Sequence, residues 1–143
     1  MFMTPQELQE RTLAFALAAY AFVRPLLRDM ETQHVARQLL RASASAASNY
    51  RAAGLARSHR EWLAKMGVAR EEADESLFWL IYVGRAGVVL GKASAIAALT
   101  DEAQQLARII AASYRTGVSR GGGSKRIDGT PSEAKAPPPE IDR

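Results

Sequence analysis

The side chains best suited to chemistry gather in and beside one stretch of the sequence, residues 38–79. Its first part places polar and basic residues at intervals of four, namely Arg37, Arg41, Ser45 and Asn49. Its second part holds four carboxylates, namely Glu71, Glu72, Asp74 and Glu75. Side chains four residues apart share one face of an α-helix. A basic stripe can therefore face an acidic one, as in an ion-pair network or an acid–base site.

This stretch is expected to fold as two helices joined by a turn around residues 54–58. If the hairpin closes antiparallel about residue 56, Arg41 comes level with about Glu71, and Arg37 with about Glu75. We therefore expect a partly buried polar network, since a buried arginine without a partner is costly. Its members are Arg37, Arg41, Ser45, Asn49, Glu71, Glu72 and Glu75. In the other interpretation, the stripe with Arg41, Ser45 and Asn49 is presented to RNA.

No complete metal-binding motif is present. Glu31 and His34 form one isolated Glu-x-x-His, whereas ferritin-like metal sites need two such motifs and two further glutamates. The sequence lacks a glycine-rich phosphate loop and a His-Glu-x-x-His motif. The glycines at 121–123 follow no expected strand. We expect no catalytic residue, no metal site, no cofactor and no enzymatic activity.

Four arginines are better candidates for contacts with phosphate, namely Arg51, Arg57, Arg60 and Arg70. Arg57 and Arg60 lie at the expected turn, where side chains reach solvent. Arginine suits bidentate pairing with phosphate better than lysine does. An ordinary solvated surface is the alternative interpretation, because a net charge of +4 does not by itself indicate nucleic acid.

The aromatic residues Trp62, Phe78, Trp79 and Tyr82 recur at helical spacing. Such rings can stack on bases, but this spacing is more typical of a core or a subunit interface. Phe78 and Tyr82 lie four residues apart, and the other face of their helix is already filled. We assign these two to an interface between subunits.

Composition describes one ordinary globular domain. The 143 residues are 48% hydrophobic and 24% charged, and no cysteine is available for a disulfide or a thiol nucleophile. Glu7, Glu10 and Arg11 do not fit the start of a signal peptide. The apolar run 13–23 is about half the roughly 20 residues that a membrane span needs. We expect a soluble, cytoplasmic protein with no membrane association.

Capping patterns and apolar periodicity predict four helices. Thr4-Pro5-Gln6-Glu7 is a capping box, and this first helix runs to about Val23. The second is expected from about Thr32 to Ala53. Ser58-His59-Arg60-Glu61 begins the third, whose end after Gly84 the pattern defines least well.

The fourth helix is expected to be capped by Thr100-Asp101-Glu102 and to end near Gly117. Short links between the helices favour an all-α fold, an antiparallel up-down-up-down four-helix bundle over residues 1–118. Residues 119–143 contain glycine and proline runs without an aromatic residue, which predicts a disordered tail.

The hairpin resembles the 23S rRNA-intervening-sequence proteins, a family of four-helix bundles. The most specific positions are Arg41, Ser45, Asn49, Ser58, Trp62, Glu72, Glu75 and Trp79. The resemblance covers about residues 8–117. Many members carry Glu-Gly shortly after the matching asparagine, where this sequence has Ala52 and Ala53.

This resemblance implies a bundle that assembles into a homo-oligomeric ring of five subunits, a pentamer. A related branch serves as the accessory protein of diversity-generating retroelements. Members of that branch bind a reverse transcriptase and nucleic acid through a basic surface.

The sequence therefore favours a non-enzymatic, oligomeric bundle that binds RNA, DNA or a nucleoprotein partner electrostatically. The alternative is a protein–protein interaction scaffold without nucleic-acid affinity, in which glutamates neutralise the arginines. Salt discriminates between the two, because counterion release makes phosphate binding weaken steeply as salt rises.

Overall fold

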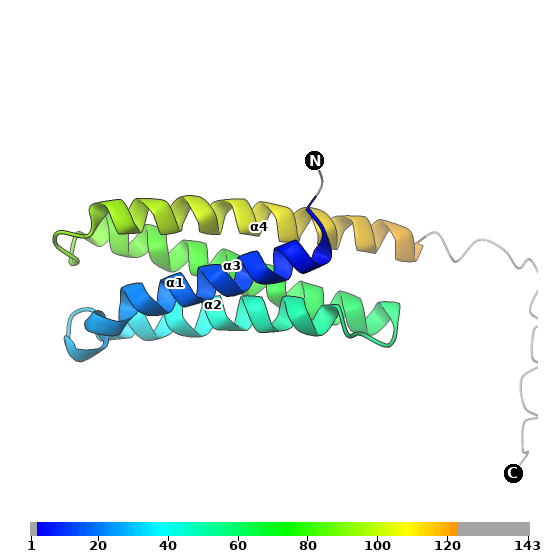
Figure 1. Ribbon diagram of the computed structural model, residues 1–143, viewed down its shortest axis with the longest axis horizontal. Coiled ribbons are helices and arrows are strands. Elements are labelled where there is room, and N and C mark those ends of the chain that lie inside the picture. Colours follow the sequence, from blue (N-terminus) through cyan, green and yellow to red (C-terminus); the bar gives the residue numbers. More distant parts are fainter. Residues whose placement is uncertain (1–2, 123–143) are drawn as a thin grey trace, which may run out of the picture.

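The computed structural model describes residues 3–122, which form helices and no strand. The elements are α1 (Pro5–Val23), the 3-10 helix η1 (Arg24–Arg28), α2 (Gln33–Ala53), α3 (His59–Ala86) and α4 (Ala93–Gly122). The α-helices lie side by side as a bundle, with the α2–α3 link at one end and the other two links at the opposite end (Figure 1). This confirms the predicted all-helical class. No helix in the described part is long and apolar enough to cross a membrane.

α1 begins where the sequence predicts because Thr4 and Glu7 cap each other. The Thr4 hydroxyl accepts a hydrogen bond from the Glu7 backbone N–H (3.1 Å). The Glu7 carboxylate accepts one from the Thr4 backbone N–H (2.7 Å). Pro5 fills the first turn, where its missing N–H leaves no helical bond unmade. The helix ends at Val23 as predicted.

α3 also starts at its predicted cap. The Ser58 hydroxyl accepts a hydrogen bond from the Glu61 backbone N–H (3.1 Å). The Glu61 carboxylate accepts its bond from the Arg57 backbone N–H (3.1 Å) rather than from Ser58, so the reciprocal bond shifts by one residue. The helix ends at Ala86, before Gly87, whose φ of 67° is a conformation that glycine adopts without strain.

The predicted start of the last helix is wrong. α4 begins at Ala93 rather than at Thr100. The Thr100 hydroxyl donates to the Ile96 carbonyl (2.6 Å) inside the helix and caps nothing. The alanine-rich segment 93–98 contains no helix-breaking residue, so the helix forms about two turns earlier than the Thr-Asp-Glu pattern indicates.

The predicted end of α4 is wrong as well, because Gly117 serves packing rather than termination. Gly117 is buried in mid-helix, and a Cβ atom there would lie only 2.0 Å from Cζ3 of Trp62. The helix continues to Gly122. Residues 119–122, predicted to begin the tail, are therefore helical. The rest of the predicted disordered tail, 123–143, lies outside the described residues.

Two clusters of buried side chains form the core. The larger draws on all four α-helices and includes Phe15, Leu39, Leu80 and Leu106. The smaller draws on α2, α3 and α4, and its buried members are Ala46, Ala53, Met66, Ala69, Ala73 and Ile110. Alanines from α2 and α3 meet in this cluster, where the alanine- and serine-only run 42–48 contributes its buried side. Trp62 packs against its edge.

An ion pair that the sequence does not reveal joins α1 to α4. The Arg11 guanidinium donates to both Glu102 oxygens, at 2.6 Å from Nε and 3.0 Å from Nη2. Arg11 also donates to Gln105 Oε1 at 2.8 Å. The hydrogen bonds that Arg11 donates to Glu102 raise the pKa of Arg11 above its ordinary value. Glu102, predicted to cap α4, thus lies inside the helix and links it to α1.

Candidate nucleic-acid interface

The packing of α2 on α3 brings Arg41 against two carboxylates of the predicted network. Arg41 Nη2 lies 2.8 Å from both Glu75 oxygens, and Nη1 lies 3.2 Å from Glu72 Oε1. The Trp79 indole N–H also donates to Glu75 Oε1 (3.3 Å). Arg41 above all, with Trp79, holds the pKa of Glu75 below its ordinary value. Glu72 Oε2 is buried and accepts no hydrogen bond within residues 3–122.

This ion-pair cluster is smaller and more exposed than the predicted network. The Arg41 side chain is 53% exposed, so it is not a desolvated cation. Glu72 and Glu75 are three residues apart and share a helical face, whereas Glu71 points away and is exposed. Arg37 is exposed too, and in the described part it makes no ion pair with these carboxylates.

Ser45 and Asn49 make a separate, local contact. The Asn49 side-chain amide donates to the Ser45 carbonyl (2.9 Å) and hydroxyl (3.2 Å). Both side chains are half-buried on α2. The four-residue stripe thus divides into an inter-helical ion pair made by Arg41 and an intra-helical hydrogen bond between Asn49 and Ser45.

Three of the four arginines predicted to contact phosphate lie around the α2–α3 link. Arg51 lies near the end of α2, Arg57 in the link and Arg60 in the first turn of α3. All three are exposed. The Arg57 side chain is 90% exposed, although its Nε lies 3.5 Å from Glu61. An ion pair as exposed as that of Arg57 with Glu61 is weak, so Arg57 remains able to contact a second anion.

Arg70 is separated from the other three. Its guanidinium carbon lies 5.3 Å from the ring centroid of Tyr114 on α4, a cation–π contact. Arg70 lines a surface depression together with Glu71 and Asp74. Their negative charge opposes phosphate, so Arg70 is the least suitable member of the predicted set.

The extended end of α4 supplies basic residues that the sequence reasoning missed. Arg115 and Arg120 are both exposed there. Arg120 comes level with the start of α3 only because α4 continues past Gly117. A signal was present in the sequence, since Gly117 and Gly121 are four residues apart and no proline interrupts residues 93–122.

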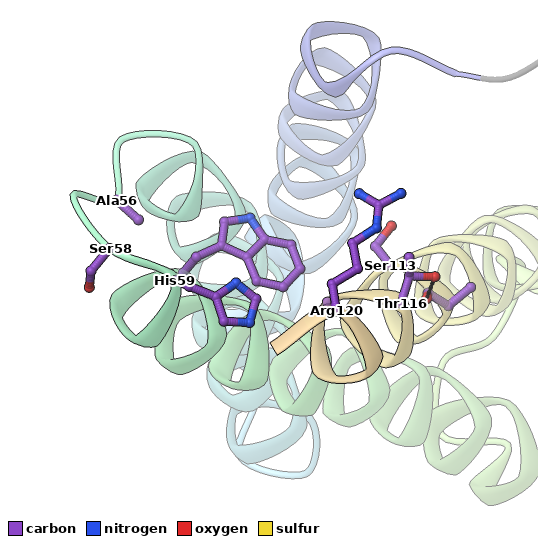
Figure 2. Close-up of a pocket in the computed structure, with 9 residues that line it drawn as sticks. Ala56, Ser58, His59, Ser113, Thr116 and Arg120 are labelled. Carbon is purple, nitrogen blue, oxygen red and sulfur yellow. Dashed lines mark hydrogen bonds between the residues drawn. The ribbon is translucent and has the colours of Figure 1, made fainter. Parts of the chain in front are cut away.

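A groove of about 770 Å³ lies between the start of α3 and the end of α4, and we call it the α3–α4 groove. Figure 2 shows His59 on its α3 side and Arg120 on its α4 side. The side chains that matter for its chemistry are those of His59, Trp62, Ser113, Thr116 and Arg120. No carboxylate is among its lining residues in the described part. The groove therefore favours anionic over cationic ligands.

The rings of His59 and Trp62 lie nearly parallel on the α3 side of this groove. Their planes differ by 11° and their centroids are 6.0 Å apart. Glycines on α4 make room for both rings. A Cβ atom at Gly121 would lie 2.6 Å from His59 Nε2, and one at Gly117 would overlap Trp62.

A comparison with solved structures supports this architecture. The chain is similar to a protein of unknown function from the S23 ribosomal protein family, from Bacteroides thetaiotaomicron VPI-5482, with a TM-score of 0.70. The two chains share one fold. The match covers 79% of this chain and 99% of that one, and the two sequences are 19% identical. A sequence identity this low supports a shared fold and nothing further. No family model matches the sequence, and no curated protein matches it.

The two residues assigned to a subunit interface lie on the surface of α3. Phe78 is 52% exposed and Tyr82 is 49% exposed. Trp79 lies between them, with ring centroids 4.9 Å from Phe78 and 5.4 Å from Tyr82. Ile81 shares their face and is also exposed. We call Phe78, Ile81 and Tyr82 the α3 apolar patch, and its role between subunits stays a prediction.

A second exposed apolar surface lies on α1 and was not predicted. Leu13, Leu17 and Tyr20 are 46%, 59% and 46% exposed. Their spacing of four and three residues places them on one helical face, which we call the α1 apolar face. They border a groove of about 380 Å³ whose α2 side includes Ala44 and Ala47.

Within residues 3–122, no group of three or more His, Cys, Asp or Glu side chains is arranged to hold a metal ion. His34, from the isolated Glu-x-x-His, packs edge-on against Trp79 with ring centroids 5.6 Å apart. At the α2–α3 end of the bundle, the side chains that line the α3–α4 groove offer a guanidinium group, aromatic rings and hydroxyls.

Proposed function

We propose that this chain is a non-enzymatic bundle of antiparallel helices that forms an oligomer and binds nucleic acid at one end. The observation that carries the proposal is the convergence of exposed arginines from separate segments at that end. They are Arg51, Arg57, Arg60 and Arg120. A phosphate backbone presents charge at every nucleotide, so its binding requires several cations on one surface. A nucleoprotein, such as a reverse transcriptase with its nucleic acid, is a partner of the same chemistry.

The charge balance at this end supports an anionic ligand. Residues 47–66 carry four Lys and Arg and residues 111–122 carry two, while these segments contain one carboxylate. The start of α1 lies at the same end, since the Tyr50 hydroxyl donates to the Pro5 carbonyl (3.5 Å). It adds Glu7 and Glu10, so six cations face three carboxylates, a net charge of +3. So modest a charge predicts weak binding by one subunit.

Assembly would compensate for that weakness. The α1 apolar face and the α3 apolar patch are different surfaces of one chain. A contact between unlike surfaces is heterologous, and it closes into a ring when the rotation permits. In the five-membered ring that the family resemblance implies, five basic ends act together and raise avidity without any new contact.

Fluorescence anisotropy tests the nucleic-acid proposal. Labelled structured RNA and duplex DNA are titrated with the full chain at several salt concentrations. Affinity should fall steeply with salt. Arg57→Ala combined with Arg60→Ala should weaken binding about tenfold and reduce the salt slope by about two, roughly one per lost phosphate contact.

The matched control is Arg24→Ala combined with Arg28→Ala. It removes the same charge from the exposed first and last residues of η1, at the opposite end of the bundle. This control should keep the affinity and the slope of the natural chain. Equal behaviour of the two double variants would exclude the α2–α3 end as the interface.

The second candidate function is an interaction scaffold without affinity for nucleic acid. The pairing of Arg57 with Glu61, and of Arg41 with Glu72 and Glu75, favours this candidate. The two exposed apolar surfaces would then carry the whole function. A scaffold should show no nucleic-acid binding even at low salt, and its assembly should persist at high salt.

A further inference from the structure

Resting on the proposed nucleic-acid binding, we propose that the α3–α4 groove receives one unstacked base of a single-stranded nucleic acid. Arg120 and the neighbouring arginines of the α2–α3 link bind the adjoining phosphates. This defines the ligand as single-stranded, because the bases of a duplex are stacked on each other and present no free face.

The size and charge of the groove fit such a ligand. Its volume of about 770 Å³ lies within the range of roughly 300–1,000 Å³ that is typical of small-molecule sites. Arg57 and Arg60 flank His59 in the sequence, and Arg120 lies across the groove. Arg120 therefore supplies a cation at the groove itself, and two further cations lie within two residues of His59 in the chain, so that phosphates next to a bound base have arginines near them.

The aromatic pair supplies the stacking surface. Base-on-aromatic contacts strengthen single-strand binding with little regard to sequence. Trp62 is held by its packing against Gly117 and the smaller core cluster. His59 is exposed, and its ring lies nearly parallel to that of Trp62. One ring is thus fixed by the fold, and the other is open to solvent.

A hydroxyl is free to contact the edge of the base. Thr116 donates to the Ala112 carbonyl (3.1 Å), whereas Ser113 makes no side-chain hydrogen bond to another described residue. Ser113 lines the groove on the α4 side. A hydroxyl that both donates and accepts suits any base, in keeping with binding that tolerates different sequences.

The test compares a labelled twelve-nucleotide oligo-deoxyadenylate with a duplex of equal length, using the full chain at low salt. His59→Ala and Arg120→Ala should each weaken single-strand binding about tenfold. In His59→Ala, duplex binding should change less than twofold, whereas Arg120→Ala removes a phosphate contact and should weaken duplex binding as well. The controls are His34→Ala, which also removes an exposed histidine beside a tryptophan, and Arg85→Ala, at the far end of α3. Both controls should leave both affinities unchanged.

Tryptophan emission gives a second measurement. The chain has two tryptophans, so Trp79→Phe leaves Trp62 as the only reporter. Adding the single strand should quench that emission, and the duplex should not. If Trp79→Phe does not fold, the anisotropy comparison still decides.

Three outcomes would overturn the inference, and they are distinguishable from one another. Groove variants that behave like the controls, while nucleic acid still binds, would reject the base site and leave the proposed function standing. No binding of either probe would reject both. A change in molar mass by light scattering in His59→Ala or Arg120→Ala would make the groove a subunit contact instead.

Discussion

Replacing Gly117 with alanine would place a methyl group inside the ring of Trp62. The new Cβ would lie 2.0 Å from Cζ3 and 2.5 Å from Cη2, whereas unbonded carbons settle at about 3.5–4.0 Å. The ring or the helix must therefore move by about 1.5 Å. Trp62 is not free to turn, because it packs against the smaller core cluster and lies beside His59.

Two opposing effects set the size of the change. Alanine is favoured over glycine inside a helix by about 1 kcal/mol. Forcing extra volume into a packed site costs about 1–3 kcal/mol, and the overlap here belongs at the upper end. The net loss should be about 1–2 kcal/mol, equivalent to a fall in melting temperature of about 4–8 °C for a domain of this size.

Thermal and urea unfolding followed by circular dichroism would measure this loss. All variants are compared at one protein concentration, because assembly contributes to apparent stability. Gly67→Ala is the matched control. Its Cβ would lie 3.6 Å from Tyr114, an ordinary contact, so only the helix propensity changes and the melting temperature should rise.

A double-mutant cycle identifies the cause. The Trp62 atoms nearest to Gly117 are Cζ3, Cη2 and Cε3, all in the six-membered ring that Trp62→Phe removes. Gly117→Ala should therefore cost less in the Trp62→Phe background. If Gly117→Ala instead stabilised the protein as Gly67→Ala does, the packing of α4 on Trp62 would be refuted.

The side chains of Arg11 and Glu102 are 27% and 32% exposed. A double-mutant cycle with Arg11→Met and Glu102→Gln should give a coupling free energy of about 1 kcal/mol. A coupling near zero would show that this ion pair does not stabilise the fold. Glu75→Gln should lower the melting temperature at pH 7. That difference should shrink as pH falls to 3, because a carboxylate with a lowered pKa stabilises the fold above its ordinary pKa and stops doing so once protonated; a constant difference would contradict the role of Arg41. Leu17→Glu and Tyr82→Glu should each block assembly, and mixing the two should give a dimer by light scattering, since each retains one intact surface; unchanged mass on mixing would exclude the heterologous contact.

Local chemistry explains why some helix starts could be predicted. The caps at Thr4 and Ser58 involve groups within four residues, so the sequence contains the whole interaction. Gly117 is different, because a glycine can end a helix or admit a neighbouring ring. Which role it takes depends on Trp62, far away in the sequence and visible only in the fold.

In the candidate site, too, some features follow from the sequence pattern and others depend on contacts between distant residues. Hairpin register predicts that Arg41 meets carboxylates of α3, and it does. The register of the hairpin does not determine how exposed a side chain is, because exposure depends on the packing of all the helices. The half-exposed state of Arg41 could therefore not be predicted. The α3–α4 groove was missed because it joins two helix ends that are about sixty residues apart in the sequence.

The length of α4 links the fold to the proposed function. If α4 ended at Gly117, Arg120 would leave the groove, and the cations at this end would come only from residues 51–65 and Arg115. Two glycines let the helix continue beneath the rings of Trp62 and His59 instead. Gly117→Ala should therefore weaken single-strand binding as well as stability, whereas Gly67→Ala should alter stability alone. If single-strand affinity were unchanged in a folded Gly117→Ala protein, the aromatic pair would not be the surface on which a base stacks.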